Sequence, residues 1–179
     1  KKNGYTFIAW YDNPDFSGSS VLSVPSGSVG DRDFYARFDI IKYTITFVTN
    51  GGIFSDTVPA GFDIEAPDIK LPVPQKTAYT FSGWYAASAL TGNPVDVIYH
   101  GTVGNIVLYA AWTPITYSIV YHTNGGDMTG IITDTYTIES DDLYLPVVTK
   151  RGYDFAGWYE NAVFSGDPVT KIAHGSYGI

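Results

Sequence analysis

Oxygen-bearing side chains near the start of the chain could bind a cation. Residues 12–15 read Asp-Asn-Pro-Asp, and carboxylate and amide oxygens are the ligands that Ca²⁺ takes in proteins. The segment lacks the longer acidic pattern of a calcium loop, which closes with a bidentate glutamate. Two later segments that align with it, 86–89 and 160–163, do not keep the pair of aspartates. We therefore interpret 12–15 as a solvated turn and predict no metal.

Histidine is the second candidate, because it can bind zinc or act as a base. The chain has three histidines, His100, His122 and His174, and no cysteine. No His-x-x-x-His pair is present, and no Gly-x-Ser-x-Gly motif presents a nucleophilic serine. We interpret His100 and His174, each followed by glycine, as loop residues. The sequence predicts no catalytic residue, no cofactor and no enzymatic activity.

Lysine and glutamate recur together in two aligned parts of the chain. Glu65 and Glu139 stand at equivalent positions, and so do Lys76 and Lys150. A lysine, a glutamate and an asparagine buried together could form an intramolecular isopeptide crosslink, with loss of ammonia or water. A glutamate that caps a turn and an exposed lysine explain the same residues without any reaction. We favour this second interpretation, because no shared apolar environment can be read from the sequence.

Aromatic side chains could stack on sugars or fill a core. The chain has 15 tyrosines, 10 phenylalanines and 4 tryptophans. Those that recur in the aligned segments, such as Tyr79, Phe81 and Trp84, suit a small core that needs large side chains. The tyrosines that do not recur are better candidates for ligand contact. These candidates are Tyr99, Tyr144 and Tyr177, whose counterparts are Ala173, Lys70 and Val103.

A repeated unit carries all of these residues. Trp10, Trp84 and Trp158 follow one another at a constant step of 74 residues, and many glycines keep the same step without insertion or deletion. Such a fixed period indicates tandem repeats. A residue that every unit needs for folding recurs at this step, whereas a site unique to one unit does not. The predicted structural signature consists of Trp10, Trp84, Trp112, Trp158, Gly83 and Gly157.

Three segments of the unit have the pattern of β-strands. Residues 43–49, 79–85 and 105–112 are rich in β-branched and aromatic side chains, and the repeat extends this prediction to their copies. Glycine directly before tryptophan predicts a bulge or a close backbone approach. Prolines in 53–78 exclude a long helix, so we expect a loop with a short strand or helical turn near 62–66. The predicted fold is mainly β, a small α+β unit with low helix content.

Composition excludes several classes of function. Only 16% of the residues are charged and the formal net charge is −8, so nucleic acid is not an expected partner. No stretch of about 18 apolar residues predicts a membrane span, and no signal peptide is recognised. The lack of cysteine argues neither for nor against secretion.

The order of the motifs resembles a known bacterial repeat family. Tyr-Thr-Ile-Thr-Phe-Val-Thr-Asn-Gly-Gly at 43–52 is followed by Tyr-Thr-Phe-Ser-Gly-Trp-Tyr at 79–85, Leu-Thr-Gly-Asn-Pro-Val at 90–95 and Ile-Val-Leu-Tyr-Ala-Ala-Trp-Thr-Pro at 106–114. This succession is similar to the Listeria–Bacteroides repeat, also called the internalin B-repeat. The resemblance implies small β-grasp-like, ubiquitin-related units. It also implies tandem arrays in secreted or cell-wall-attached, virulence-associated bacterial proteins, and no catalytic residues.

The resemblance also implies where each unit begins and ends. Residues 43–116 form one complete repeat, 1–42 the C-terminal part of another and 117–179 the N-terminal part of a third. The first part carries the closing strand that the third lacks, and the third carries the opening strand that the first lacks. Two molecules could therefore complete each other head to tail.

We expect an extracellular module on a bacterial surface or in a secreted protein that acts as a stalk or spacer. The resemblance adds adhesion to a glycan or protein of a host or neighbouring cell, for which the variable loops 53–63 and 127–137 are candidates. The alternative is a non-catalytic, carbohydrate-binding accessory module of a larger secreted enzyme.

Overall fold

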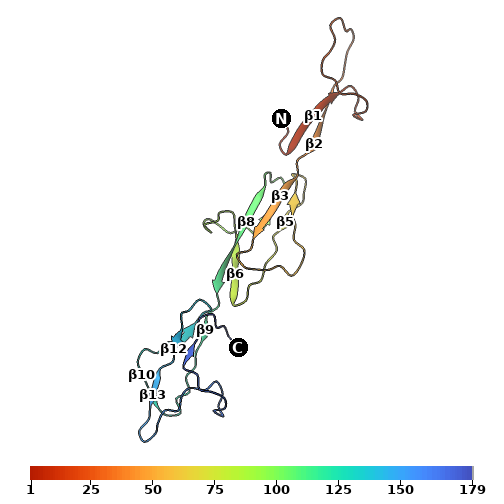
Figure 1. Ribbon diagram of the computed structural model, residues 1–179. Coiled ribbons are helices and arrows are strands. Elements are labelled where there is room, and N and C mark those ends of the chain that lie inside the picture. Colours follow the sequence, from red (N-terminus) through yellow and green to blue (C-terminus); the bar gives the residue numbers. More distant parts are fainter. Residues whose placement is uncertain (179) are drawn as a thin grey trace. The chain divides into compact units, whose positions relative to one another are not determined.

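The computed structural model describes residues 1–178, and every regular element in that range is a β-strand (Figure 1). The prediction of a mainly β fold with low helix content is confirmed. The strands are β1 Tyr5–Tyr11, β2 Tyr35–Ile40, β3 Tyr43–Val48, β4 Gly61–Phe62, β5 Ile69–Lys70, β6 Tyr79–Tyr85, β7 Val97–Ile98, β8 Ile106–Pro114, β9 Tyr117–Ser118, β10 Asp127–Thr129, β11 Thr135–Tyr136, β12 Leu143–Tyr144, β13 Val147–Thr149 and β14 Lys171–Ile172.

The chain separates into two compact units. The first comprises Lys1–Pro74 and Gly83–Ala111. The second comprises Gln75–Ser82 and the chain from Trp112 onward. Strands β1 to β5 and β7 belong to the first unit and β9 to β14 to the second, while β6 and β8 contribute residues to both.

The complete repeat is built on a four-stranded sheet with the order β4-β3-β8-β6. Strand β3 pairs antiparallel with β4, with Tyr43 opposite Phe62, and parallel with β8, with Ile45 opposite Ile106. Side chains alternate between the two faces of a strand, and this alternation buries Ile45 in the core, where Leu108 of β8 is also buried. The three segments that the sequence predicts as strands are β3, β6 and β8, with ends that differ by at most two residues.

Trp84 lies at the centre of this core and is almost completely buried. The ring centroids of Phe47 and Phe54 lie 4.9 and 6.0 Å from the indole, and the indole N–H donates to the carbonyl of Pro72 at 2.7 Å. Gly83 has a φ of +128°, and a Cβ there would lie 2.8 Å from the Cβ of Pro94. The predicted close backbone approach is therefore confirmed at this glycine.

The first repeat contains a two-stranded sheet, β1 with β2. The pairing shifts between Phe7 and Ala9, so the bulge predicted from glycine before tryptophan occurs here with alanine in the place of glycine. Strand β2 begins at Tyr35, four residues after the predicted start at Asp31. In the complete repeat, the residues equivalent to 32–35 pair with β3, and the first repeat has no such partner strand in the described range.

In the third repeat, two strand predictions are wrong. Of the copy of β3 at 117–123, only Tyr117 and Ser118 form a strand, and the copy of β6 at 153–159 makes isolated bridges at its ends. In the complete repeat, both segments lie in the sheet that contains β8. No strand of the described residues pairs with these two segments in the way that β8 does in the complete repeat.

Other parts of the third repeat reproduce the complete repeat in register. The pairing of β9 with β11 copies that of β3 with β4, and β12 with β14 copies β5 with β7. The indole N–H of Trp158 donates to the carbonyl of Pro146 at 2.7 Å, as Trp84 does to Pro72. The region near 62–66 and its copy form short strands and turns instead of a helical turn.

Candidate functional site

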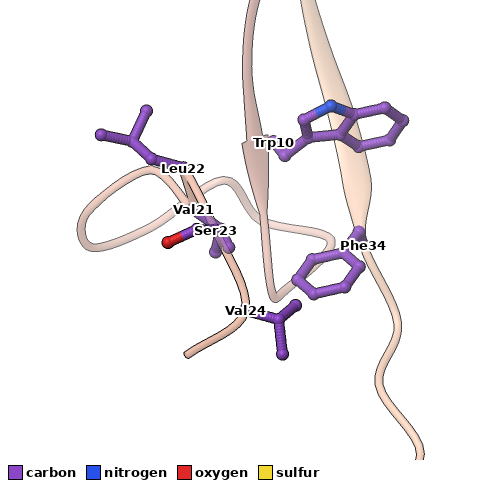
Figure 2. Close-up of a pocket in the computed structure, with 6 residues that line it drawn as sticks. All are labelled: Trp10, Val21, Leu22, Ser23, Val24 and Phe34. Atoms are coloured by element: carbon purple, nitrogen blue, oxygen red, sulfur yellow. The ribbon is translucent and has the colours of Figure 1, made fainter. Parts of the chain in front are cut away.

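An open groove surrounds Trp10 in the first repeat (Figure 2). It has a volume of about 220 Å³ and is lined by Trp10, Val21, Leu22, Ser23, Val24 and Phe34. Strand β1 supplies Trp10, and the backbone N–H of Val21 donates to the carbonyl of Trp10 at 2.7 Å, which fixes one wall. Figure 2 shows Leu22 and the Ser23 hydroxyl on the side away from the two aromatic rings.

The groove corresponds to a surface that is buried in the complete repeat. Trp10 is 47% exposed, whereas its counterpart Trp84 is 1% exposed. Phe34 is 38% exposed, whereas its counterpart Leu108 is 1% exposed. In the complete repeat, Phe47, Phe54 and the carbonyl of Pro72 cover Trp84.

The side chains that line the groove are mostly apolar, which suits contact with an apolar surface. Its six residues include no charged side chain, and one hydroxyl and one indole N–H are the only polar side-chain groups among them. Within 1–178, no group of three or more histidine, aspartate or glutamate residues could hold a metal ion.

A second recurrent arrangement joins consecutive repeats. The hydroxyl of Tyr5 in the first repeat donates to Glu65 of the complete repeat. The hydroxyl of Tyr79 in the complete repeat donates to Glu139 of the third repeat at 2.8 Å. Both pairs span 60 residues, and each lies inside one of the compact units. We call these two contacts the junctions.

A lysine stabilises the tyrosine at each junction. The Nζ atom of Lys2 lies 3.6 Å from the ring centroid of Tyr5, and that of Lys76 lies 4.0 Å from the ring centroid of Tyr79. A cation over a ring face is attracted by the ring quadrupole. Lys76 also lies 5.9 Å from the ring centroid of Trp112, one of the predicted structural tryptophans.

The junctions change the acidity of both tyrosines. The hydrogen bond to Glu65 raises the pKa of Tyr5, and the hydrogen bond to Glu139 raises the pKa of Tyr79. The cause is the same in both cases, because a carboxylate that accepts from the phenol favours its protonated form. Both phenols are therefore protonated, and able to donate, at neutral pH.

The junctions also place the recurrent lysines and glutamates. Glu65 accepts a hydrogen bond from Tyr5, and Lys76 lies over Tyr79. Glu65 and Glu139 thus each have a tyrosine partner in the preceding repeat, in addition to the turn-capping role predicted from the sequence. A signal was present in the sequence, because Tyr5, Tyr79 and Tyr153 recur at the same 74-residue step as the lysines.

The other predicted site residues lie in turns or on the surface. Asn13 and its counterpart Asn161 brace the same turn, each accepting from the backbone N–H of the serine four residues later. His100 and His174 make equivalent bonds, in which each backbone N–H donates to an aspartate and each ring Nδ1 contacts a backbone carbonyl. Equivalent bonds at equivalent positions indicate structural roles.

The three candidate tyrosines for ligand contact all lie on the surface. Tyr99 is exposed in the first compact unit, and Tyr144 and Tyr177 are exposed in the second. Their role in ligand contact stays a prediction. Residues 1–178 contain no helix that is long and apolar enough to cross a membrane.

Comparison with known proteins supports the sequence resemblance. The profile of the Listeria–Bacteroides repeat domain matches residues 1–37, 43–111 and 117–174. A protein of Evansella cellulosilytica described as a Gly-rich membrane protein is 30% identical over 162 residues, which cover 89% of this chain and 18% of that protein. Internalin H of Listeria monocytogenes is 35% identical over 114 residues, which cover 63% of this chain and 20% of internalin H.

The chain thus spans about a fifth of the length of these relatives. No solved structure is significantly similar to it. The three matched segments follow the 74-residue step of the tryptophans and cover most of the sequence. This chain belongs to the Listeria–Bacteroides repeat domain family.

Proposed function

We propose that this chain is a repeat module of a bacterial surface protein and acts as a spacer that holds another part of the protein away from the cell. The junctions support a spacer most strongly, because the same tyrosine–glutamate contact links two successive pairs of repeats. The names of the relatives, a membrane protein and an internalin, support a location at the cell surface.

A spacer needs connections that resist bending. The connectors between repeats are short, and each is held by a backbone bond to the preceding repeat. The N–H of Ile41 donates to the carbonyl of Gly4, and the N–H of Ile115 donates to the carbonyl of Ala78, both at 2.9 Å. Lys42 in the first connector also forms an ion pair with Asp63. These bonds reduce the freedom of the connectors relative to a flexible linker.

We further propose that 43–116 is the repeating unit and that its fold is β-grasp-like. The parallel pairing of β3 with β8, the first and last long strands of the unit, supports this arrangement. Residues 1–42 and 117–179 would then be parts of the same unit.

Pulsed electron–electron distance measurements on the intact chain test the spacer proposal. The sequence lacks cysteine, so spin labels can be attached at Gln75→Cys and Ala162→Cys, which are exposed, lie in the complete and third repeats and belong to the same compact unit. The proposal predicts one narrow distance distribution that broadens in Glu139→Ala. The exposed Glu160→Ala serves as a control and should leave the distribution unchanged. A broad distribution before any junction substitution would contradict the proposal.

Adhesion is a second candidate function, favoured by one exposed apolar feature. Ile131 and Ile132 are exposed in the variable loop 127–137. Binding of the intact chain to glycans, mucin and matrix proteins, compared with Ile131→Ser, tests this function. Loss of saturable binding in the variant would support adhesion, and an absence of binding would leave the spacer as the better account.

A further inference from the structure

We propose that the complete repeat bears force, and that β3 and β8 form a clamp that resists tension applied along the chain. The clamp consists of β3, the asparagine Asn50 that follows it, and residues 105–110 of the β8 segment. The proposal rests on the spacer function, because a module that holds another part of a protein away from a cell is loaded along its chain.

The direction of the strands decides how tension acts on the clamp. Strands β3 and β8 pair in parallel, from Ile45 opposite Ile106 to Val48 opposite Tyr109. In a parallel pair, the start of one strand and the end of the other lie at opposite ends of the pair. The chain enters the clamp at the start of β3 and leaves it along β8. Tension therefore slides the two strands past each other and loads all the bonds between them together.

Two asparagine side chains extend the clamp beyond the four residue pairs of the backbone ladder. At its start, the backbone N–H of Thr44 donates to Oδ1 of Asn105 at 3.0 Å. At its end, Nδ2 of Asn50 donates to the backbone carbonyl of Ala110 at 2.7 Å. Because these two bonds lie on either side of the ladder, sliding of the strands strains them at the same time as the ladder.

The turn after β3 positions Asn50 for its bond to β8. Asn50 has a φ of +50°, in the left-handed region that asparagine adopts more readily than most residues. The N–H of Gly52 donates to the carbonyl of Thr49 at 3.1 Å, which closes the turn. The asparagine of this Asn-Gly-Gly motif thus serves both the turn and the clamp.

Side chains oppose the same sliding motion on one face of the clamp. Ile45 and Leu108 are buried there, and the ring centroid of Phe47 lies 4.9 Å from that of Trp84. Close packing means that these side chains cannot slide without losing contacts. Burial also limits the access of water, which replaces hydrogen bonds as they break.

Optical tweezers can load the clamp in two directions. Because the sequence lacks cysteine, handles can be attached at introduced cysteines on exposed positions. Lys42→Cys with Thr116→Cys places the handles before β3 and after β8, so force shears the clamp. Lys42→Cys with Val103→Cys places both handles three residues before the first pair of the ladder (45−42 and 106−103), so force peels the strands apart. Loss of the ion pair of Lys42 with Asp63 is common to both.

The proposal predicts resistance that depends on direction. The unfolding force in shear should be at least about twofold higher than in peeling, because hydrogen bonds of similar strength break together in shear and one after another in peeling. Equal unfolding forces in the two directions would overturn the proposal.

Two asparagine variants distinguish the clamp from a general contribution to stability. Asn50→Gly permits the positive φ and removes the bond to Ala110, which peeling from the start of β3 loads last. It should accelerate unfolding at a fixed force about fivefold in shear, the factor that corresponds to one ordinary hydrogen bond, and leave peeling unchanged. Asn105→Ala removes the bond that peeling loads first, so it should accelerate unfolding in both directions. Asn93→Gly changes an exposed loop asparagine outside the clamp and should alter neither.

Failure of the clamp can be distinguished from failure of the spacer. An effect of Asn50→Gly that is the same in both directions would refute the clamp. A narrow label distance distribution together with equal unfolding forces would also refute the clamp and leave the spacer proposal in place. A broad distance distribution together with a higher force in shear would refute the spacer and support the clamp.

Discussion

Replacing the equivalent tryptophans Trp84 and Trp10 by alanine should have unequal costs. A fully buried aromatic side chain removes about 150–250 Å² from water, worth about 4–6 kcal/mol at about 25 cal/mol per Å². Trp84 is 1% exposed, and its loss also leaves the carbonyl of Pro72 without its donor. Large-to-small substitutions in cores typically cost about 3–5 kcal/mol, so we expect about 4 kcal/mol for Trp84→Ala. Trp10 is 47% exposed and should cost about half as much, about 2 kcal/mol.

Native-state hydrogen exchange measures the two costs separately, because it reports the local free energy of opening for each part of a protein. Peptides that cover β3 and β8 report on Trp84→Ala, and peptides that cover β1 and β2 report on Trp10→Ala. Equal losses of protection in the two repeats would refute the reasoning, because they would mean that Trp10 is as well packed as Trp84.

Four further outcomes follow from the structure. Gly83→Ala should lower the thermal unfolding temperature of the complete repeat, because an alanine at φ +128° is strained and its Cβ would meet Pro94 at 2.8 Å. Gly92→Ala is the control. It is also at positive φ but has open space around it, so it should lower this temperature less. Tyr79→Phe should remove a phenol that titrates above the ordinary tyrosine pKa in an ultraviolet titration, since Glu139 raises the pKa of Tyr79. The Tyr79–Glu139 junction should be stable below the unfolded tyrosine pKa near 10 and be lost as the pH rises through the raised value, which label-to-label distances can follow. The hydrogen bond from Lys171 lowers the pKa of Asp142, so the stability that this pair contributes should be present above about pH 4 and be lost as the pH falls further. Asp142→Asn should therefore reduce the change in unfolding free energy with pH in this acidic range.

The sequence predicts the complete repeat well because its signals are local. Alternation and β-branched residues mark β3, and glycine before tryptophan marks the close approach of Gly83 to Pro94. These properties depend on backbone conformation and on near neighbours, which a 74-residue period repeats faithfully. The same reasoning over-predicts strands in the third repeat. The segment 153–159 has a strand-forming sequence, but a strand also needs a neighbour to bond with.

The candidate sites are less predictable because they depend on what covers a residue. Trp10 and Trp84 occupy equivalent positions in the repeat, and Trp84 is a core residue because Phe47, Phe54 and the carbonyl of Pro72 cover its ring. The junctions join residues 60 positions apart, so a search for short motifs finds Glu65 and Tyr5 separately without showing that they touch. The 74-residue recurrence of Tyr5 and Glu65 indicates that both residues have a role in every repeat, and the structure shows that they bond to each other.

Backbone relaxation by nuclear magnetic resonance tests the central claim, that successive repeats are held together by the tyrosine–glutamate junctions. Amides of residues 79–82 of the complete repeat and of β12 in the third repeat, which lie in the same compact unit, should report one common rotational correlation time if Tyr79 and Glu139 hold these segments together. Glu139→Ala should separate the two values. Two different and shorter correlation times in the unsubstituted protein would contradict the account.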